Sequence, residues 1–294
     1  MSLFKPYNYK NRPETNDAPL KKNRFFIFWE IFFRKFWRFV SLNAVYFLIT
    51  LPIMLYFYYT ANGFFVSRFG DSYVDLLPGV GFIAALVSGL PSVLYVPILV
   101  LSILLYGPLK MGMTYVYRNY TREEHAWFSD VWEKAKENWK QGVVFGVLDF
   151  LITLVLVNNI VGGFSTQNTG VGILMLASRY LSIILLVVFL FVRHYSYLIA
   201  VSVELPVRAI IKNSLLFVVM GLGRNILSTA ACAALWLLSL FTLPLASVVC
   251  LPLLTYAVCG FATVYICYPT VKKYIIVPAM KLSQERGLEE ETDK

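Results

Sequence analysis

The feature that most constrains this chain is a series of long apolar stretches, each about as long as a membrane-spanning helix. A bilayer core needs about 20 consecutive apolar residues in helical form. Six such windows occur, at about Phe39–Tyr59, Val93–Val116, Gly142–Ile160, within Gly172–Val203, Ile226–Leu243 and Ala246–Cys267. The sequence therefore predicts an all-α fold, a polytopic membrane helix bundle with six transmembrane helices.

Composition excludes the main alternatives to a membrane protein. Of the 294 residues, 58% are hydrophobic and only 15% are charged. A soluble domain typically carries about 25% charged residues and could not bury this much apolar surface. Disordered and collagen-like chains are excluded by the same figures.

The distribution of basic residues predicts the orientation of the bundle. Cytosolic segments next to membrane helices are enriched in Lys and Arg. With six spans, 24 of the 26 Lys and Arg residues fall on one side, Lys110 and Arg193 being counted there, and only Arg68 and Arg179 fall on the other. We expect both termini to be cytosolic and Arg179 to extend its head group to the outer surface. The net charge of +9 then faces anionic lipid, and because it is spread over four segments it does not indicate nucleic-acid binding.

Three regions follow from this arrangement. Residues 1–23 form a polar cytosolic tail, residues 24–268 the membrane domain, and residues 269–294 a second cytosolic tail. Each half of the membrane domain shows a membrane helix, a cytosolic amphipathic stretch and a membrane helix. This order suits a parallel repeat of three spans.

Two amphipathic segments are predicted to lie along the membrane surface. In residues 24–38 one helical face is aromatic, and the other carries Glu30, Arg34 and Arg38. This segment is either an interfacial elbow or a docking helix for a partner.

The second amphipathic segment, residues 121–140, is the most polar internal part of the chain. Thr121 and Glu124 match a capping box at its start. We interpret it as a cytosolic helix that is either a surface elbow or a coupling helix for a partner. The candidate partner-contact surface consists of Phe128, Trp132, Lys136 and Trp139.

Asp149 is the most informative single residue, because it lies well inside the third predicted span. An ionisable group at such a depth is costly unless it is paired or hydrated. Arg193 in the fourth apolar stretch is expected at a similar depth. The candidate intramembrane pair Asp149–Arg193 either fixes helix register or lines a path for a solute.

No motif predicts catalysis or a cofactor. The chain has no Walker A loop, no H-E-x-x-H and no G-x-S-x-G sequence. The four cysteines all lie in the last apolar region without metal-ligand spacing. We expect no catalytic, metal or cofactor site, and no enzymatic activity.

Several short motifs resemble the YesL family of small bacterial membrane proteins. The similarity spans residues 25–148, about half the chain. It rests on Phe36-Trp37-Arg38, Asn43, Leu51-Pro52, Gly107-Pro108, Tyr115-Val116-Tyr117-Arg118, Phe128-Ser129-Asp130-Val131-Trp132 and Asn138-Trp139-Lys140-Gln141-Gly142.

The resemblance implies a place in the plasma membrane of a Gram-positive-type bacterium, in association with carbohydrate uptake. It carries over no catalytic residue. The first functional hypothesis is therefore an accessory membrane protein that contacts the permease subunits of a sugar ABC transporter or a sensor kinase. The second is a small-solute permease or channel in its own right, with Asp149 and Arg193 near its site. A membrane enzyme is the third and least favoured.

Overall fold

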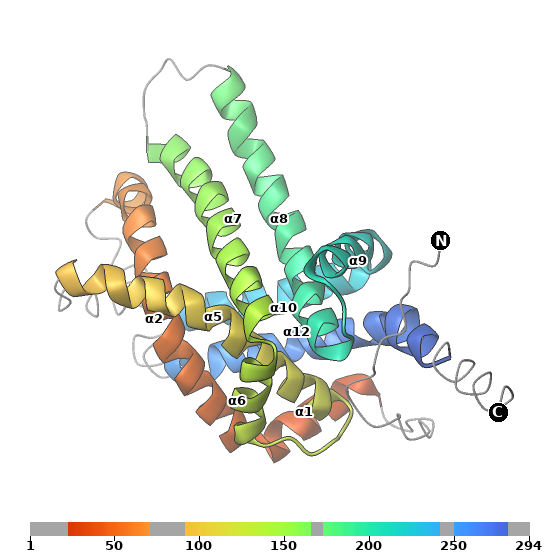
Figure 1. Cartoon of the computed structure of the whole chain (residues 1–294). Helices are drawn as coiled ribbons and strands as arrows, with labels where there is room; N and C mark the ends of the chain where they lie inside the picture. Colours follow the sequence, from red (N-terminus) through yellow and green to blue (C-terminus); the bar gives the residue numbers. More distant parts are fainter. Residues whose placement is uncertain (1–22, 71–91, 166–172, 242–249, 282–294) are drawn as a thin grey trace, which may run out of the picture.

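The computed structural model describes residues 23–70, 92–165, 173–241 and 250–281, and every regular element within these ranges is helical (Figure 1). The elements are α1 (Arg24–Arg34), α2 (Phe36–Phe69), α5 (Ser92–Thr121), α6 (Phe128–Glu137), α7 (Trp139–Ser165), α8 (Ile173–Ser202), α9 (Val207–Met220), α10 (Leu222–Phe241), η1 (Leu251–Thr255), α12 (Tyr256–Val271) and η2 (Lys272–Ile276).

Within the described ranges six helices are long and apolar enough to cross a membrane, the number that the sequence predicts. They are Phe36–Ala61, Leu94–Thr121, Trp139–Val161, Ile173–Ser202, Leu222–Ser239 and Leu253–Lys281. The first helix continues to Phe69, beyond the predicted end near Tyr59, and the last continues past Cys267. The predicted boundary between the fifth and sixth spans lies outside the described residues, as do nearly all of the first predicted tail and half of the second.

A short helix leads into a membrane helix at three places through nearly the same backbone bend. The bend residues are Lys35 (φ −113°, ψ 17°), Asn138 (φ −100°, ψ 21°) and Gly221 (φ −104°, ψ 16°). Each donates its backbone N–H to the carbonyl four positions earlier. The chain thus shows three units, α1-α2-α5, α6-α7-α8 and α9-α10-α12, in place of the predicted two halves of three spans each.

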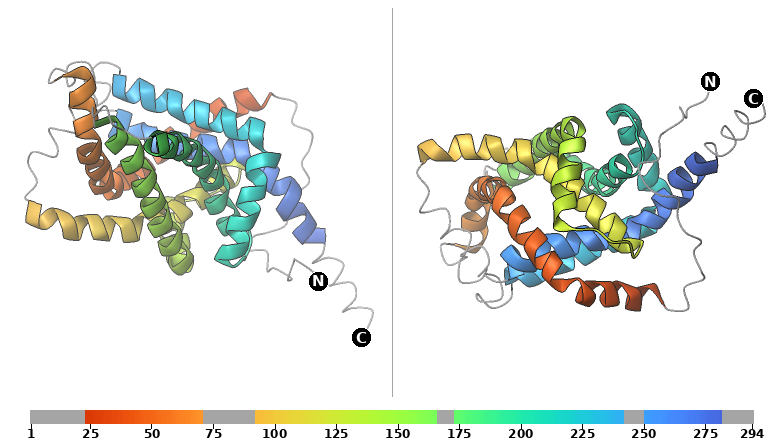
Figure 2. Two further views of the ribbon diagram at one scale, coloured as in Figure 1. Left: turned by 90° about the horizontal axis from the view of Figure 1, so that it is seen from above. Right: turned by 60° about the horizontal axis from the view of Figure 1, so that its bottom comes forward.

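The second membrane helices of these units, α5, α8 and α12, contact one another and form the interior. Their cores include fully buried side chains such as Tyr195, Leu198 and Phe261. The first part of α8 is different, because Ile173 and Leu174 are each 86% exposed. Figure 1 shows α7 and α8 projecting from the rest of the bundle there, and Figure 2 gives two further views of the helices. The projecting ends present apolar side chains suited to a lipid environment.

Helix α1 packs against the last membrane helix through its aromatic face. Phe28 stacks on Phe261 with ring centroids 5.1 Å apart, and the Arg24 guanidinium donates to the Tyr265 carbonyl at 3.0 Å. On the outside of this helix Phe25 and Phe33 are more than half exposed. The segment is therefore attached to the bundle on one side and apolar on the other.

The start of the second amphipathic segment was predicted wrongly. Thr121 ends α5, and its hydroxyl donates to the Tyr117 carbonyl at 2.9 Å. Helix α6 begins seven residues later, and its cap is formed by Asp130, which accepts the Trp127 backbone N–H at 2.9 Å. The prediction failed because Thr121 bonds back into the preceding helix instead of starting a new one.

Arg179 is also placed differently from expectation. Its residue exposure is only 8%, so the side chain lies within the bundle and does not extend to the outer surface.

Candidate functional site

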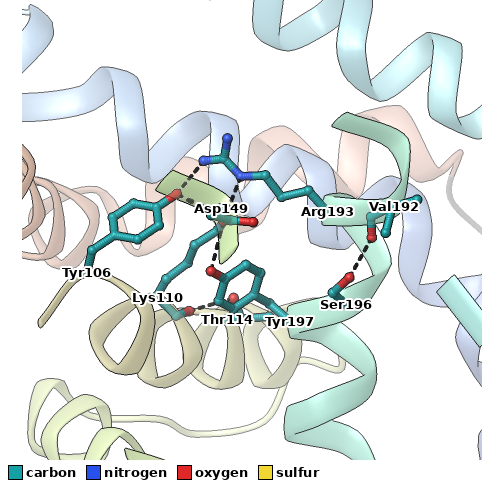
Figure 3. Close-up of polar contacts among 8 residues, drawn as sticks. All are labelled: Tyr106, Lys110, Thr114, Asp149, Val192, Arg193, Ser196 and Tyr197. Carbon is teal, nitrogen blue, oxygen red and sulfur yellow. Dashed lines mark hydrogen bonds and ion pairs between the residues drawn. The ribbon is translucent and has the colours of Figure 1, made fainter. Parts of the chain in front are cut away.

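Side chains from three helices converge on Asp149, which lies on α7 (Figure 3). Lys110 Nζ on α5 and Arg193 Nε on α8 each lie 3.2 Å from Asp149 Oδ2. The Tyr197 hydroxyl donates to the same oxygen at 2.8 Å, and the Tyr106 hydroxyl donates to it at 3.4 Å. One carboxylate oxygen thus joins α5, α7 and α8. We call these five residues the Asp149 cluster.

Helical spacing explains why the cluster needs only three helices. Tyr106 and Lys110 are four residues apart on α5, and Arg193 and Tyr197 are four residues apart on α8. Residues at this spacing lie on the same helical face. The Arg193 guanidinium also donates to the Tyr106 hydroxyl, so the two pairs contact each other directly.

A close approach of α5 and α7 brings Asp149 within reach of Lys110. A Cβ atom at Gly142 would lie 2.6 Å from the Pro108 Cα, and one at Gly146 would lie 2.8 Å from the Gly107 backbone nitrogen. Only glycine fits at such contacts, and small residues commonly allow membrane helices to pack closely. The Gly142-x-x-x-Gly146 sequence therefore sets the separation at which the cluster forms.

The cluster is largely removed from solvent. The side-chain exposure is 10% for Asp149, 19% for Lys110 and 30% for Arg193. Removing one partner from a buried ion pair typically costs about 3–5 kcal/mol, because the other charge is left uncompensated. Asp149 is also the only acidic residue within the six described spans. One carboxylate therefore faces two basic side chains.

The structure brings the two predicted residues, Asp149 and Arg193, into direct contact. Lys110 was missed, because it was assigned to the cytosolic rim when basic residues were counted. It lies inside the second span together with Arg118, so these two residues and Arg193 do not contribute to a surface rim. The four-residue spacing of Lys110 from Tyr106 was the available signal that it faces the interior.

A cavity of about 410 Å³ lies beside the cluster and is bounded by α2, α5, α8, α10 and α12. Lys110 and Arg193 line one part of it, and Trp236 and Tyr256 line another. The two aromatic rings meet edge to face at a centroid distance of 5.1 Å. Small-molecule sites are typically cavities of this order of size, with apolar walls and a few convergent polar groups. We call this cavity the chamber.

Further polar groups of the chamber come from α8, α10 and α12. His194 Nε2 lies 2.9 Å from the Thr229 hydroxyl oxygen, so the ring is held against α10. Cys232 Sγ lies 3.4 Å from the Thr263 hydroxyl oxygen. Among the described residues no group of three metal-ligating side chains occurs. The arrangement supplies hydrogen-bond donors, cations and aromatic surface.

The predicted partner-contact surface lies at the junction of α6 and α7. Phe128, Trp132 and Trp139 are 40%, 42% and 43% exposed, and Lys136 is exposed beside them. Lys136 and Trp139 border an open groove of about 690 Å³, whose other wall is the α8–α9 connection at residues 204–206. Gln141 fixes that wall by donating to the Leu205 carbonyl at 2.8 Å.

The fold and site together define a helical protein whose described residues form six helices long and apolar enough to cross a membrane, and five of these helices line a partly charged chamber. Residues 77–160 match a family described as "Protein of unknown function, DUF624". The matched stretch includes α5, α6 and most of α7, and with them Tyr106, Lys110 and Asp149, whereas Arg193 and Tyr197 lie outside it. The comparisons gave no match among curated proteins and none among solved structures.

Proposed function

We propose that this protein is a multi-pass protein of a bacterial plasma membrane that binds a small solute in the chamber, as a permease or as the solute-binding part of an uptake system. The observation that carries the proposal is the position of Lys110 and Arg193 on the chamber wall. Charged groups inside a membrane domain are costly to maintain and commonly mark solute or ion pathways. The proposed activity is binding and transfer without catalysis.

The surroundings of Lys110 and Arg193 support this assignment. A purely structural ion pair is expected to be surrounded by packed side chains, as the fully buried core of α8 and α12 is. Lys110 and Arg193 instead border a space large enough for a small molecule, which Trp236 and Tyr256 also line. Polar orienting groups together with aromatic surface are the usual composition of a small-molecule site.

Trp236 provides a direct test of solute binding. It is the only tryptophan among the residues that line the chamber. In protein reconstituted into lipid nanodiscs, we expect a solute from a panel of sugars, sugar acids and amino acids to change the tryptophan fluorescence. The change should be lost in Trp236→Phe and kept in Trp132→Phe, a control on the outside of α6. A response that is equal in both variants would contradict binding in the chamber.

Transport is then measured with the solute that the fluorescence assay identifies. Flux into proteoliposomes that contain only this protein would define a permease. Binding without flux would define a solute-binding component that works with another protein.

A second candidate function is an accessory subunit of a carbohydrate transporter or of its sensing system. It is favoured by the groove between α6–α7 and the α8–α9 connection, because a partner helix could occupy a groove bordered by Lys136 and Trp139. The match of residues 77–160 covers the α6–α7 side of this groove and the motifs from Gly107-Pro108 onward that resemble YesL proteins, whereas residues 204–206 and the motifs at residues 36–52 lie outside it. Purification from native membranes in a mild detergent tests it. Transporter permease or kinase subunits should copurify with the wild type and be lost with Trp132→Ala/Lys136→Glu.

The proposed orientation places both termini in the cytosol. Its support is the concentration of basic residues on the side of α1, α6 and α9. A C-terminal reporter that is active only outside the cell is expected to be silent. Activity of that reporter would exclude an even number of spans with a cytosolic N-terminus.

A further inference from the structure

We propose that the chamber selects anions, and that its ligand carries a carboxylate or phosphate monoester group that lies against Lys110 and Arg193. This inference rests on the proposed function, since it assumes that a solute enters the chamber. It adds the charge class of that solute.

The described lining of the chamber contains basic side chains and no carboxylate. Two cationic side chains, Lys110 and Arg193, line the chamber, whereas their carboxylate partner Asp149 does not line it. Asp149 is 8% exposed and lies behind them, against α5 and α8. No other acidic residue lies within the six described spans. The chamber lining therefore carries two basic side chains and no carboxylate.

The positive charge of these side chains is only partly neutralised by the groups that surround them. Coulomb interactions are several times stronger inside a protein than in water, so an excess cation there attracts a counter-charge strongly. Aromatic faces supply part of the compensation, because Lys110 Nζ lies 3.9 Å from the centroid of the Tyr197 ring. Tyrosine and threonine hydroxyls supply dipoles but no charge. An anion is the one occupant that balances the wall.

The hydrogen-bond donors of Arg193 and Lys110 have a geometry that suits an anionic group. Arg193 Nε contacts Asp149 and Nη2 contacts Tyr106, and within the described residues Nη1 has no hydrogen-bond partner (Figure 3). A guanidinium presents planar donors that suit the oxygens of carboxylates and phosphates. Lys110 adds an ammonium group on the same wall. Together they can hold two oxygens of one anionic group.

The aromatic residues and the size of the chamber restrict the rest of the ligand. Trp236 and Tyr256 add an aromatic surface to the chamber lining, and the volume of about 410 Å³ limits the solute to a small molecule. The expected ligand has an anionic head near Lys110 and Arg193 and a body that packs on these rings. A cationic solute would be repelled by the same wall.

Cys232 allows the charge preference to be measured inside the chamber, because it lines the chamber wall. The test uses full-length protein in which Cys250, Cys259 and Cys267 are replaced by alanine. Two methanethiosulfonate reagents of similar size are compared, one carrying a sulfonate and one a trimethylammonium group. The Cys232 thiolate attacks the reagent's sulfenyl sulfur, a mixed disulfide forms, and methanesulfinate leaves. Each rate is divided by the rate with a small free thiol to remove intrinsic reactivity.

We expect the anionic reagent to react faster by a factor of about ten in these normalised rates. The preference should fall in Lys110→Gln and in Arg193→Gln, and it should remain in Arg208→Gln, which removes an exposed charge outside the chamber. Equal rates, or faster reaction of the cationic reagent, would overturn the anion assignment and leave solute binding intact. Failure of both reagents to modify Cys232 would instead overturn the proposed function.

A second measurement does not depend on the folding of charge variants. Acetate and inorganic phosphate are added as competitors to the same single-cysteine protein, with tetramethylammonium as the cationic control. Slower labelling in acetate alone assigns a carboxylate, and slower labelling in phosphate alone assigns a phosphate ester. Protection by neither anion, or equal protection by tetramethylammonium, overturns the proposal.

Discussion

Two buried arginines, Arg118 and Arg193, show how differently this bundle treats a cation in its interior. Arg118 is 1% exposed, and its guanidinium donates to the Val201 carbonyl at 2.7 Å near the end of α8. It also lies over the Tyr115 ring at 4.9 Å. Arg193 is paired with a carboxylate, shares it with Lys110, and borders the chamber.

The difference separates a cation that stabilises the fold from one that is available to a ligand. A cation near a helix C-terminus interacts favourably with the terminal carbonyls, so Arg118 is satisfied by backbone that is always present. Its surroundings are packed. Arg193 has a partner that it must share and a cavity on its other side. The site of Arg118 depends on shape and hydrogen bonding, and the site of Arg193 depends on charge balance.

The largest effect is expected from Asp149→Asn, which removes the only carboxylate of the Asp149 cluster. It leaves Lys110 and Arg193 facing each other, and we expect a loss of about 3–5 kcal/mol in stability. The measurement is thermal unfolding of detergent-purified protein followed by fluorescence-detected gel filtration.

Combination with Lys110→Gln sharpens this prediction. The double variant removes the repulsion between Lys110 and Arg193 that Asp149→Asn alone leaves, so its loss should be smaller than the sum of the two single losses by about 0.5–3 kcal/mol. Strict additivity would show that the three charges do not act as one cluster.

A somewhat smaller loss is expected from Arg118→Met. The substitution keeps an apolar side chain of similar length but leaves the buried Val201 carbonyl without its donor, which costs about 1–3 kcal/mol. Because Arg118 is not on the chamber wall, solute binding by the folded fraction should be unchanged. Loss of binding with normal stability would contradict the division between the two arginines.

The close contact of α5 and α7 gives the next prediction. In Gly142→Ala the new methyl group meets the Pro108 backbone, so α7 must move away from α5 and the Lys110–Asp149 distance must increase. We expect a loss of about 1–3 kcal/mol from overpacking. Gly223→Ala is the matched control, because nothing lies within 4 Å of a Cβ atom at that position. Equal stability of the two variants would argue against the close approach.

The smallest effect is expected at Lys35, a basic residue outside the six described spans. Burial, with Arg38 and Arg34 nearby, lowers the pKa of Lys35 to about 8. Its Nζ lies 3.9 Å from the centroid of the Tyr120 ring and donates to the Glu124 carbonyl at 3.3 Å. Since a lowered pKa leaves the amine neutral above that pH, acylation of Lys35 should rise with a midpoint near pH 8 and then level off.

Peptide mapping of acylated protein over a pH series measures this midpoint, and Lys35→Arg identifies the signal. A rate that still rises steeply well above pH 9 would show that the α1–α2 junction is more hydrated than its contacts indicate.

Much of the architecture could be predicted from the sequence because a bilayer imposes a length on apolar helices. Six windows and an intramembrane Asp149 follow from that requirement alone, and Arg193 follows from its similar depth. Lys110 was not assigned in the same way, because it lies near the end of the predicted span Val93–Val116, where cations ordinarily reach the membrane surface. Its true position depends on tertiary contacts with Asp149 and Tyr197.

The three equivalent bends could not be predicted, since Lys35, Asn138 and Gly221 share no chemical property. The bend is a backbone conformation that different residues adopt once the following helix is packed. The chamber could not be predicted for a similar reason. Its walls come from five helices, and no local pattern in the sequence records which side chains will face one another.

The most direct test of the account compares two native cysteines in one folded protein. Cys232 lines the chamber, whereas Cys267 is 0% exposed and is not part of its wall. A water-soluble thiol reagent, with modified sites identified by mass spectrometry, should label Cys232 and leave Cys267 unlabelled until the protein is denatured. Protection of Cys232 to the same degree as Cys267 would contradict the claim that solutes reach the charged chamber.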